Sequence, residues 1–332
     1  MRRSKIQGVA LITVMLVVAL AAVIATQMLA RLQLQVQRTT NINFNQQAYW
    51  YAMGAEALAK RVLITSFKEE KDFTHLGQIW AQGETTYPVD FGEISGEITD
   101  LHACFNLNAL KGKENRNINQ NQTSENQRVH DAFKALIMAI DVEGIDDFEA
   151  ENMTNALADW LDDNSALRSG DSAEDNDYAA KEFGYLPANN YLASVNELRV
   201  IVNFTVPVIN ELKKHVCIIP NSNLHQVNIN TLSNEQPELL QALLSVSRDE
   251  AEQILSARDA DGYKNIEVFF NLPEVSKIEN IEDKKQQFVV DSEYFKLKAK
   301  ANFNNSYFQL NSTLHVANNN KISVISRTIG RD

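Results

Sequence analysis

The sequence predicts an α+β protein in which a long N-terminal helix packs on a small antiparallel sheet, with a large all-helical domain inserted in that sheet. An uncharged apolar stretch opens the chain and continues as an amphipathic helical pattern, which predicts the long helix. Apolar and polar residues alternate near residue 90 and again near the C-terminus, which predicts the sheet. Residues 106–285, between these two regions, have helical periodicity instead, which predicts the insertion.

The apolar stretch runs from Val9 to Ala30 and contains no charged residue, proline or glycine. At about 1.5 Å per residue it forms a helix of about 33 Å, which matches the roughly 30 Å hydrocarbon core of a bilayer. The basic residues Arg2, Arg3 and Lys5 precede it. Because positive charge stays on the cytoplasmic side, we expect a single membrane span with everything after Arg31 exported.

Two common explanations fit only part of this N-terminal segment. A cleaved secretory signal could end near Ala21, but the helical pattern continues without proline to near Ile64. A plain single-span anchor explains the apolar residues. It explains neither Gly8, which separates the basic head from the span, nor the long amphipathic continuation.

The predicted sheet comes in two parts. Tyr87 to Leu101 alternates around two glycines and predicts a hairpin that packs on the alanine-rich face of the long helix. Ser292 to Phe303, Ser306 to Ala317 and Lys321 to Gly330 alternate in the same way and predict three strands joined by asparagine-rich turns.

The intervening helical region contains an internal repeat. The segment 105–110 (FNLNAL) recurs 122 residues later as 227–232 (VNINTL), and helical segments of similar pattern follow both copies. We interpret residues 106–217 and 227–285 as two related units, the first with an extra loop. In the second unit Ala257 to Tyr263 is similar to the turn of helix-hairpin-helix or SAM-like modules.

Composition argues against nucleic-acid binding and against catalysis. The formal charge is −12, and removing a leader of +3 gives −12 − 3 = −15, whereas phosphate attraction needs clustered Lys and Arg. The six histidines are scattered, and no H-E-x-x-H, G-x-S-x-G, G-x-x-x-x-G-K or C-x-x-C motif occurs. We therefore expect neither a nucleic-acid partner nor an enzyme.

The two cysteines, Cys104 and Cys217, both fall in the part expected to be exported. Disulfides form in that environment, so we predict that they are bonded to each other. The alternative is two separately buried thiols.

One loop of the first unit is strongly acidic. Between Asp141 and Glu182 the sequence has 14 acidic residues against Arg168 and Lys181. A solvated acidic loop is the plain interpretation. A hard cation such as calcium, which takes six to eight oxygen ligands, would neutralise the same carboxylates, although the spacing is not that of an EF-hand.

A family resemblance begins at the N-terminus. The segment Lys5 to Val14 (KIQGVALITV) resembles the processing site of type IV prepilins and pseudopilins, where a membrane peptidase cuts after the glycine and methylates the new amino terminus. The resemblance implies a cut between Gly8 and Val9. It also implies an assembly role for Thr13, because most such subunits have Glu there. A missing Glu is typical of the minor pseudopilin of the K type from the type II secretion system.

The acidic loop resembles the same family. DWLDDN at 159–164, then a glycine, then EDNDY at 174–178 is similar to the calcium-binding segment of the K-type proteins. The resemblance implies calcium as the cofactor, with Asp162, Asn164, Glu174 and Asp177 as ligands. Further candidates from the same segment are Asp159 and Asp175. Asn164 stands where the family usually has Asp, and an amide oxygen ligates with less charge.

What the resemblance implies is a role in assembly. The protein would sit at the tip of the type II secretion pseudopilus, initiate its assembly and support protein export across the outer membrane. Its partners would be the other minor pseudopilins, the major pseudopilin, the prepilin peptidase and the inner-membrane assembly platform. It would lie in the bacterial inner membrane with its C-terminal bulk in the periplasm. A minor subunit of a type IV or competence pilus is the alternative, and a tethered periplasmic enzyme is a second one.

The expected domain organisation follows from these patterns. It comprises a leader at 1–8, a transmembrane part at 9–30, the first part of a pilin domain at 31–105, the inserted helical domain at 106–285, and the C-terminal strands of the pilin domain at 286–332.

Overall fold

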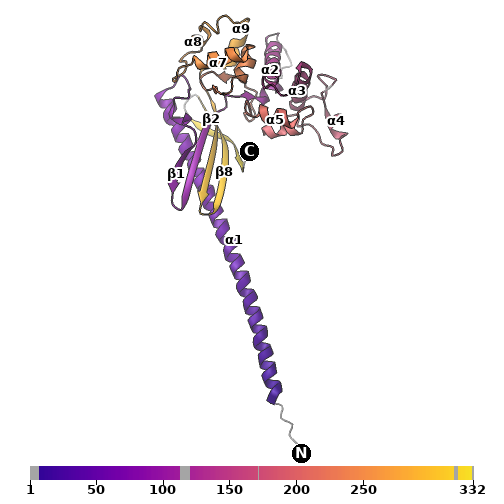
Figure 1. Ribbon diagram of the computed structural model, residues 1–332, viewed down its shortest axis with the longest axis vertical. Coiled ribbons are helices and arrows are strands. Elements are labelled where there is room, and N and C mark those ends of the chain that lie inside the picture. The colour runs from indigo at the N-terminus through magenta and orange to yellow at the C-terminus, as the bar shows by residue number, and fades with distance from the viewer. Residues whose placement is uncertain (1–6, 113–119, 171, 318–320, 331–332) are drawn as a thin grey trace, which may run out of the picture.

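The structure, a computed structural model, describes residues 7–112, 120–170, 172–317 and 321–330. Figure 1 shows a long helix, α1 (Gln7–Glu69), that projects far below a sheet, with the N-terminus at its free end. The remaining helices gather at the opposite end of the sheet. The N-terminus and the helical insert therefore lie at opposite ends of the molecule.

Helix α1 has 63 residues and extends five residues beyond the expected end at Ile64, to Glu69. Its second half packs on the sheet through Ala48, Ala52, Ala55 and Ala59, all buried. Alanine has no side chain beyond Cβ, so the helix backbone can come close to the strands. The first half is long and apolar enough to cross a membrane, and the span that meets this criterion is not buried inside the molecule.

The sheet has five antiparallel strands in the order β1-β2-β7-β8-β9. Their bounds are β1 (Thr85–Val89), β2 (Gly92–Asp100), β7 (Tyr294–Phe303), β8 (Ser306–Val316) and β9 (Ile322–Ile329). β2 pairs with β7, so all residues between them form an insertion into one sheet. The close approach requires Gly92, because a Cβ there would lie 1.8 Å from the carbonyl oxygen of Asn302. The predicted fold class is confirmed.

The insertion is mostly helical. Its α-helices are α2 (Gln120–Ala139), α3 (Asp147–Leu161), α4 (Asp175–Ala179), α5 (Val206–Leu212), α6 (Glu238–Leu244), α7 (Arg248–Ser256), α8 (Ile266–Phe270) and α9 (Ile281–Lys284). Its short 3-10 helices are η2 (Leu107–Lys111), η3 (Val195–Arg199) and η4 (Lys285–Gln287), and η1 (Ile79–Ala81) precedes β1.

Two short parallel strand pairs, which the helical periodicity did not predict, frame the insertion. β3 (Phe105–Asn106) pairs with β4 (Val216–Cys217), and β5 (Val227–Asn228) pairs with β6 (Phe288–Val289). Each pair joins the first and last residues of one helical stretch. The chain thus returns to its starting point before it continues.

Asparagine side chains hold these stretches at matching positions. Asn108 accepts a hydrogen bond from the Leu192 N–H (2.7 Å) and donates to the Leu192 carbonyl (3.2 Å). Asn230 bonds to the N–H and carbonyl of Tyr263 in the same way, at 2.7 and 2.9 Å. A buried amide that bonds both backbone groups of one residue acts as an additional strand partner. Both stretches nevertheless share one hydrophobic core, which includes Phe133 and Phe269.

An ion pair joins α1 to the last strand. Glu56 is 1% exposed and accepts from Arg327 at 2.7 and 3.0 Å and from the Ser312 hydroxyl at 2.7 Å, and Lys60 lies at 2.9 Å. Burial by itself would raise the pKa of Glu56, but the hydrogen bonds from these partners outweigh it and lower the pKa to about 2. The carboxylate is therefore charged and fully engaged.

Candidate functional site

The acidic loop connects α3 to α4, and an aromatic contact holds its two ends together. Trp160, in the last turn of α3, meets Tyr178 of α4 edge to face, with ring centroids 5.1 Å apart. Tyr178 is fully buried and packs in turn on Tyr185 at 5.3 Å. This contact brings the carboxylates at the end of α3 to those at the start of α4.

Three of those carboxylates are buried. Asp159 is 0%, Asp162 is 6% and Glu174 is 4% exposed. Arg168 reaches the first two: its Nε lies 3.1 Å from Asp159 Oδ1, and its Nη2 lies 3.0 Å from Asp162 Oδ2. The Arg168 N–H also donates to Asp159 Oδ2 at 3.1 Å. One guanidinium, itself exposed, thus pairs with two carboxylates from the end of α3.

Glu174 lacks such a partner. Both of its carboxylate oxygens are buried without a hydrogen bond, as is Oδ1 of Asp175. The pKa of Glu174 is raised to about 7, mainly by burial and to a smaller extent by repulsion from Asp159, Asp162 and Asp175. Loss of solvation on burial likewise raises the pKa of Asp159. Buried oxygens without partners are what a hard cation would satisfy.

Comparisons with known proteins decide the family. Two family models described as type II secretion system protein K match residues 103–221 and 227–291. The type II secretion system protein K of Aeromonas hydrophila is 35% identical over 97% of both chains, and that of Klebsiella pneumoniae is 37% identical over 82% of this chain and 81% of the relative. The chain belongs to the type II secretion system protein K family.

A solved structure agrees with this membership. The crystal structure of the GspK-GspI-GspJ complex from the type II secretion system of enterotoxigenic Escherichia coli contains a chain that is 30% identical. The match covers 89% of this chain and 100% of the chain in the complex, with a TM-score of 0.77. Membership in the protein K family makes the chain a minor pseudopilin of type II secretion and disfavours the alternative of a type IV or competence pilus subunit.

The expected calcium ligands of this protein K family chain divide into buried and exposed residues. Asp159, Asp162 and Glu174 lie in the buried cluster, with Asp175 half-buried beside them. Asn164 and Asp177 are exposed. Among the residues that the structure describes, no three His, Cys, Asp or Glu side chains lie close enough together to hold a metal ion.

The two exposed residues have local roles in the loop. Asn164 Oδ1 accepts from the Ala166 N–H at 2.8 Å, and its amide donates to Asp162 Oδ1 at 2.8 Å. Asp177 Oδ2 accepts from the Glu174 N–H at 3.1 Å, which satisfies an otherwise free donor at the start of α4. Both positions therefore shape the backbone that carries the buried carboxylates.

At the N-terminus, α1 already includes Gly8 and Val9, while Met1 to Ile6 lie outside the described residues. Thr13 donates its hydroxyl proton toward the carbonyls of Ala10 (2.9 Å) and Val9 (3.2 Å). A hydroxyl that bonds its own helix is tolerated in an apolar environment, unlike an unpaired carboxylate.

The predicted disulfide is present. Cys104 and Cys217 are bonded, with their Cα atoms 5.8 Å apart. Cys104 directly precedes β3 and Cys217 is the last residue of β4, so the bond links the beginning and the end of the first helical stretch.

The sequence did not assign the basic residues at the acidic loop to their partners. Lys111 Nζ donates to the Leu161 carbonyl at 2.7 Å and to Asp163 at 2.5 Å. Its partner Asp163 is 52 residues away in sequence. Arg168 was counted as a charge, but its proximity to Asp159 and Asp162 requires the loop to fold back, which no periodicity signals.

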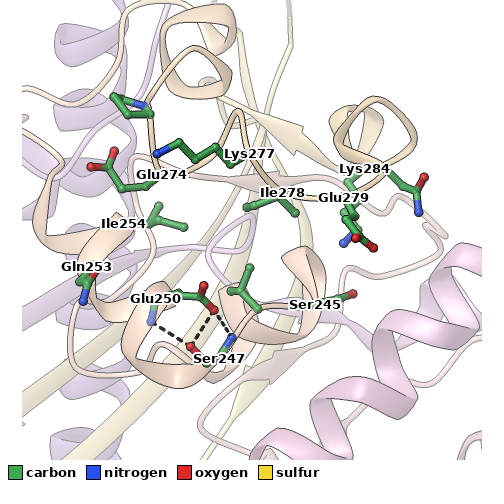
Figure 2. A pocket seen from close by; sticks show the side chains of 13 residues that line it. Ser245, Ser247, Glu250, Gln253, Ile254, Glu274, Lys277, Ile278, Glu279 and Lys284 are labelled. Carbon is green, nitrogen blue, oxygen red and sulfur yellow. Dashed lines mark hydrogen bonds between the residues drawn. The ribbon is translucent and has the colours of Figure 1, made fainter.

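A pocket of about 710 Å³ lies in the second helical stretch, away from the acidic loop. Figure 2 shows the side chains of Ile254 and Ile278 in this pocket and the bonds between Ser247 and Glu250. The Ser247–Glu250 bonds cap the start of α7, and Lys284 donates to the last carbonyl of α6, that of Leu244. These polar groups complete helix ends.

Proposed function

We propose that this protein K family chain stands at the tip of the type II secretion pseudopilus, initiates its assembly with the other minor pseudopilins and supports export across the outer membrane. The observation that carries the proposal is the position of the insertion. The helical insert lies at the end of the sheet opposite the free end of α1 (Figure 1). A subunit that docks through α1 would add from below, and the insert would obstruct a subunit above.

The N-terminal steps belong to the same proposal. A prepilin peptidase would cut between Gly8 and Val9 and methylate the new amino terminus. Helix α1 would hold the chain in the inner membrane, with the remainder in the periplasm. Thr13, which satisfies its own hydroxyl, would need no partner amino terminus in a neighbouring subunit.

Partners follow from the family and from the solved complex. That complex contains three proteins, GspK, GspI and GspJ. By analogy, this chain would bind two other minor pseudopilins, with the major pseudopilin below them and the inner-membrane platform driving assembly. We retain the domain division at residues 1–8, 9–30, 31–105, 106–285 and 286–332; for the insertion at 106–285, the support is the pairing of β2 with β7. The role would be structural rather than catalytic.

Calcium would order the acidic loop. Asp159, Asp162, Glu174 and Asp175 supply the carboxylate oxygens, and Asn164 and Asp177 could join them after a loop rearrangement. The support is the pair of buried Glu174 oxygens without a partner. Since ions that bind only the folded state stabilise it, calcium would raise the stability of the loop.

Complementation of a deletion strain tests the proposal. The full chain should restore export of the type II substrates, and Gly8→Val should restore neither processing nor export, because the leader would stay attached. Ile6→Leu is the matched control in the leader and should behave as the wild type. Normal export with an uncleaved Gly8→Val chain would refute assembly as a processed pseudopilin.

A further inference from the structure

Arg168 contacts two of the buried carboxylates that the calcium proposal uses. Its Nε lies 3.1 Å from Oδ1 of Asp159, and its Nη2 lies 3.0 Å from Oδ2 of Asp162. The Arg168 side chain is 42% exposed, whereas the two aspartate side chains are 0% and 8% exposed. The guanidinium therefore reaches these carboxylates from the solvent side.

The pairing leaves part of the cluster unsatisfied. Oδ1 of Asp159 lies 3.1 Å from the guanidinium but accepts no hydrogen bond. Neither oxygen of Glu174 accepts one, and the same holds for Oδ1 of Asp175. With all four carboxylates ionised, Asp162 included, the one guanidinium leaves a formal charge of +1 − 4 = −3. Arg168 thus supplies only part of the positive charge and of the hydrogen bonds that these oxygens require.

A bound calcium ion and the Arg168 guanidinium would compete for the same oxygens. Calcium takes about six to eight oxygen ligands, so an ion in this loop needs the carboxylates of Asp159 and Asp162. Arginine has hydrogen-bond donors and no acceptor, so its side chain cannot become a ligand itself. Two like charges held on the same buried carboxylates also repel each other. The guanidinium and the ion therefore cannot both occupy the cluster.

We propose that Arg168 is a built-in competitor of calcium. In the calcium-free chain its guanidinium holds the carboxylates of Asp159 and Asp162, and it moves out into solvent when the ion binds. The exposure of the Arg168 side chain leaves room for this exchange. The Arg168 backbone N–H, which donates to Oδ2 of Asp159 at 3.1 Å, can stay in place. This inference rests on the calcium part of the proposed function and names the residue that sets the affinity.

The competition has two consequences of opposite sign. Without calcium, Arg168 stabilises the loop, because it gives two buried carboxylates a counter-charge. With calcium, the same contact must be broken first, so it weakens the apparent affinity. If the paired state holds about nine-tenths of the calcium-free chains, the apparent Kd is about tenfold higher than in a chain without the competitor.

The experiment uses the full chain in detergent and calcium chloride. Isothermal titration calorimetry measures the Kd, and thermal unfolding is followed in chelator and in saturating calcium. Arg168→Met should lower the Kd about tenfold, which corresponds to about 1.4 kcal/mol. The same free energy should lower the melting temperature in chelator by about 3–6 °C and leave that in saturating calcium unchanged. A residue with only a structural role would instead weaken calcium binding when it is removed.

Lys181→Met is the matched control, because it removes the same charge from the same segment. The Lys181 Nζ donates to the Tyr185 hydroxyl at 2.8 Å, so it does not hold the carboxylates of the cluster. Its Kd should stay within about twofold of the wild type, since exposed charges interact weakly. Arg168→Lys keeps the charge but lacks the planar fork that bridges two carboxylates, so its Kd should fall between those of the wild type and Arg168→Met.

The outcomes separate this inference from the calcium proposal. A Kd of Arg168→Met equal to or above that of the wild type, or an equal fall in Lys181→Met, would overturn the inference. If Arg168→Met does not fold, a wild-type Kd in Arg168→Lys would do so. A wild-type chain and variants that all bind no calcium would instead overturn the calcium part of the proposed function.

Discussion

Breaking the ion pair between Glu56 and Arg327 should loosen α1 from the sheet. Arg327→Met removes the two hydrogen bonds of the guanidinium while Glu56 remains buried at 1% exposure. The shift of the Glu56 pKa from 4.5 to about 2 corresponds to about 3 kcal/mol, at about 1.4 kcal/mol per pKa unit. A buried charge that loses one partner costs about 3–5 kcal/mol. Lys60 and Ser312 remain, so we expect a loss near the lower end, about 3 kcal/mol.

The assay is thermal and urea unfolding of the full chain in detergent. At about 2–4 °C per kcal/mol, the melting temperature should fall by about 6–12 °C. Arg61→Met is the control, because it removes an exposed arginine from the same helix and should change stability by less than about 0.5 kcal/mol. A double variant with Glu56→Gln should recover part of the loss, since it removes the buried charge that has lost its arginine.

The pH dependence provides a second check. Since folding lowers the pKa of Glu56, its stabilising contribution is present above about pH 4.5 and is lost as the pH falls toward 2. The difference in unfolding free energy between the wild type and Glu56→Gln should therefore shrink over that interval. An Arg327→Met chain as stable as the wild type would refute the reasoning.

Three further predictions concern the insertion. Folding raises the pKa of Glu174 from 4.5 to about 7, so without calcium the chain loses stability as the pH rises through this interval. Glu174→Gln should therefore stabilise the calcium-free chain at pH 8 by about 3 kcal/mol. It should also reduce the rise in melting temperature on adding calcium, as calorimetry with and without chelator would measure. An equal calcium effect in the variant would contradict the assignment of Glu174. Reducing the bond between Cys104 and Cys217, which are 113 positions apart in sequence, should cost about 4–5 kcal/mol in the chain-entropy model. Equal denaturation midpoints of the oxidised and reduced chains would show that the bond adds nothing. Asn230→Leu leaves the N–H and carbonyl of Tyr263 without their partner and should cost about 2–3 kcal/mol in urea unfolding. The same substitution at exposed Asn210 should cost much less, and similar losses would argue against the double hydrogen bond.

Periodicity predicted the regular elements well. The strand predicted at Ser306–Ala317 is β8 at Ser306–Val316, because alternating residues on a sheet packed against a helix leave a clear pattern. The insertion between β2 and β7 also followed, since alternation stops at Leu101 and resumes after residue 288. The two-residue strand pairs β3–β4 and β5–β6 are too short to leave any periodic signal.

Pairing between distant side chains was not predictable. Glu56 and Arg327 are 271 residues apart, and each alone looks like an ordinary surface charge. The acidic loop was recognisable by composition, yet its structure separates buried Glu174 from exposed Asp177, which a count of carboxylates does not do. Sequence thus indicated the region of the candidate site, and only the fold determined which oxygens lack partners.

Locating the chain on the pseudopilus tests the central claim most directly. Pseudopili would be assembled with an epitope-tagged version of this chain, isolated and labelled with gold-conjugated antibody. If the insert blocks addition above it, the label should sit at one end of each filament and nowhere else. Labels spaced along the filament length would contradict the tip assignment.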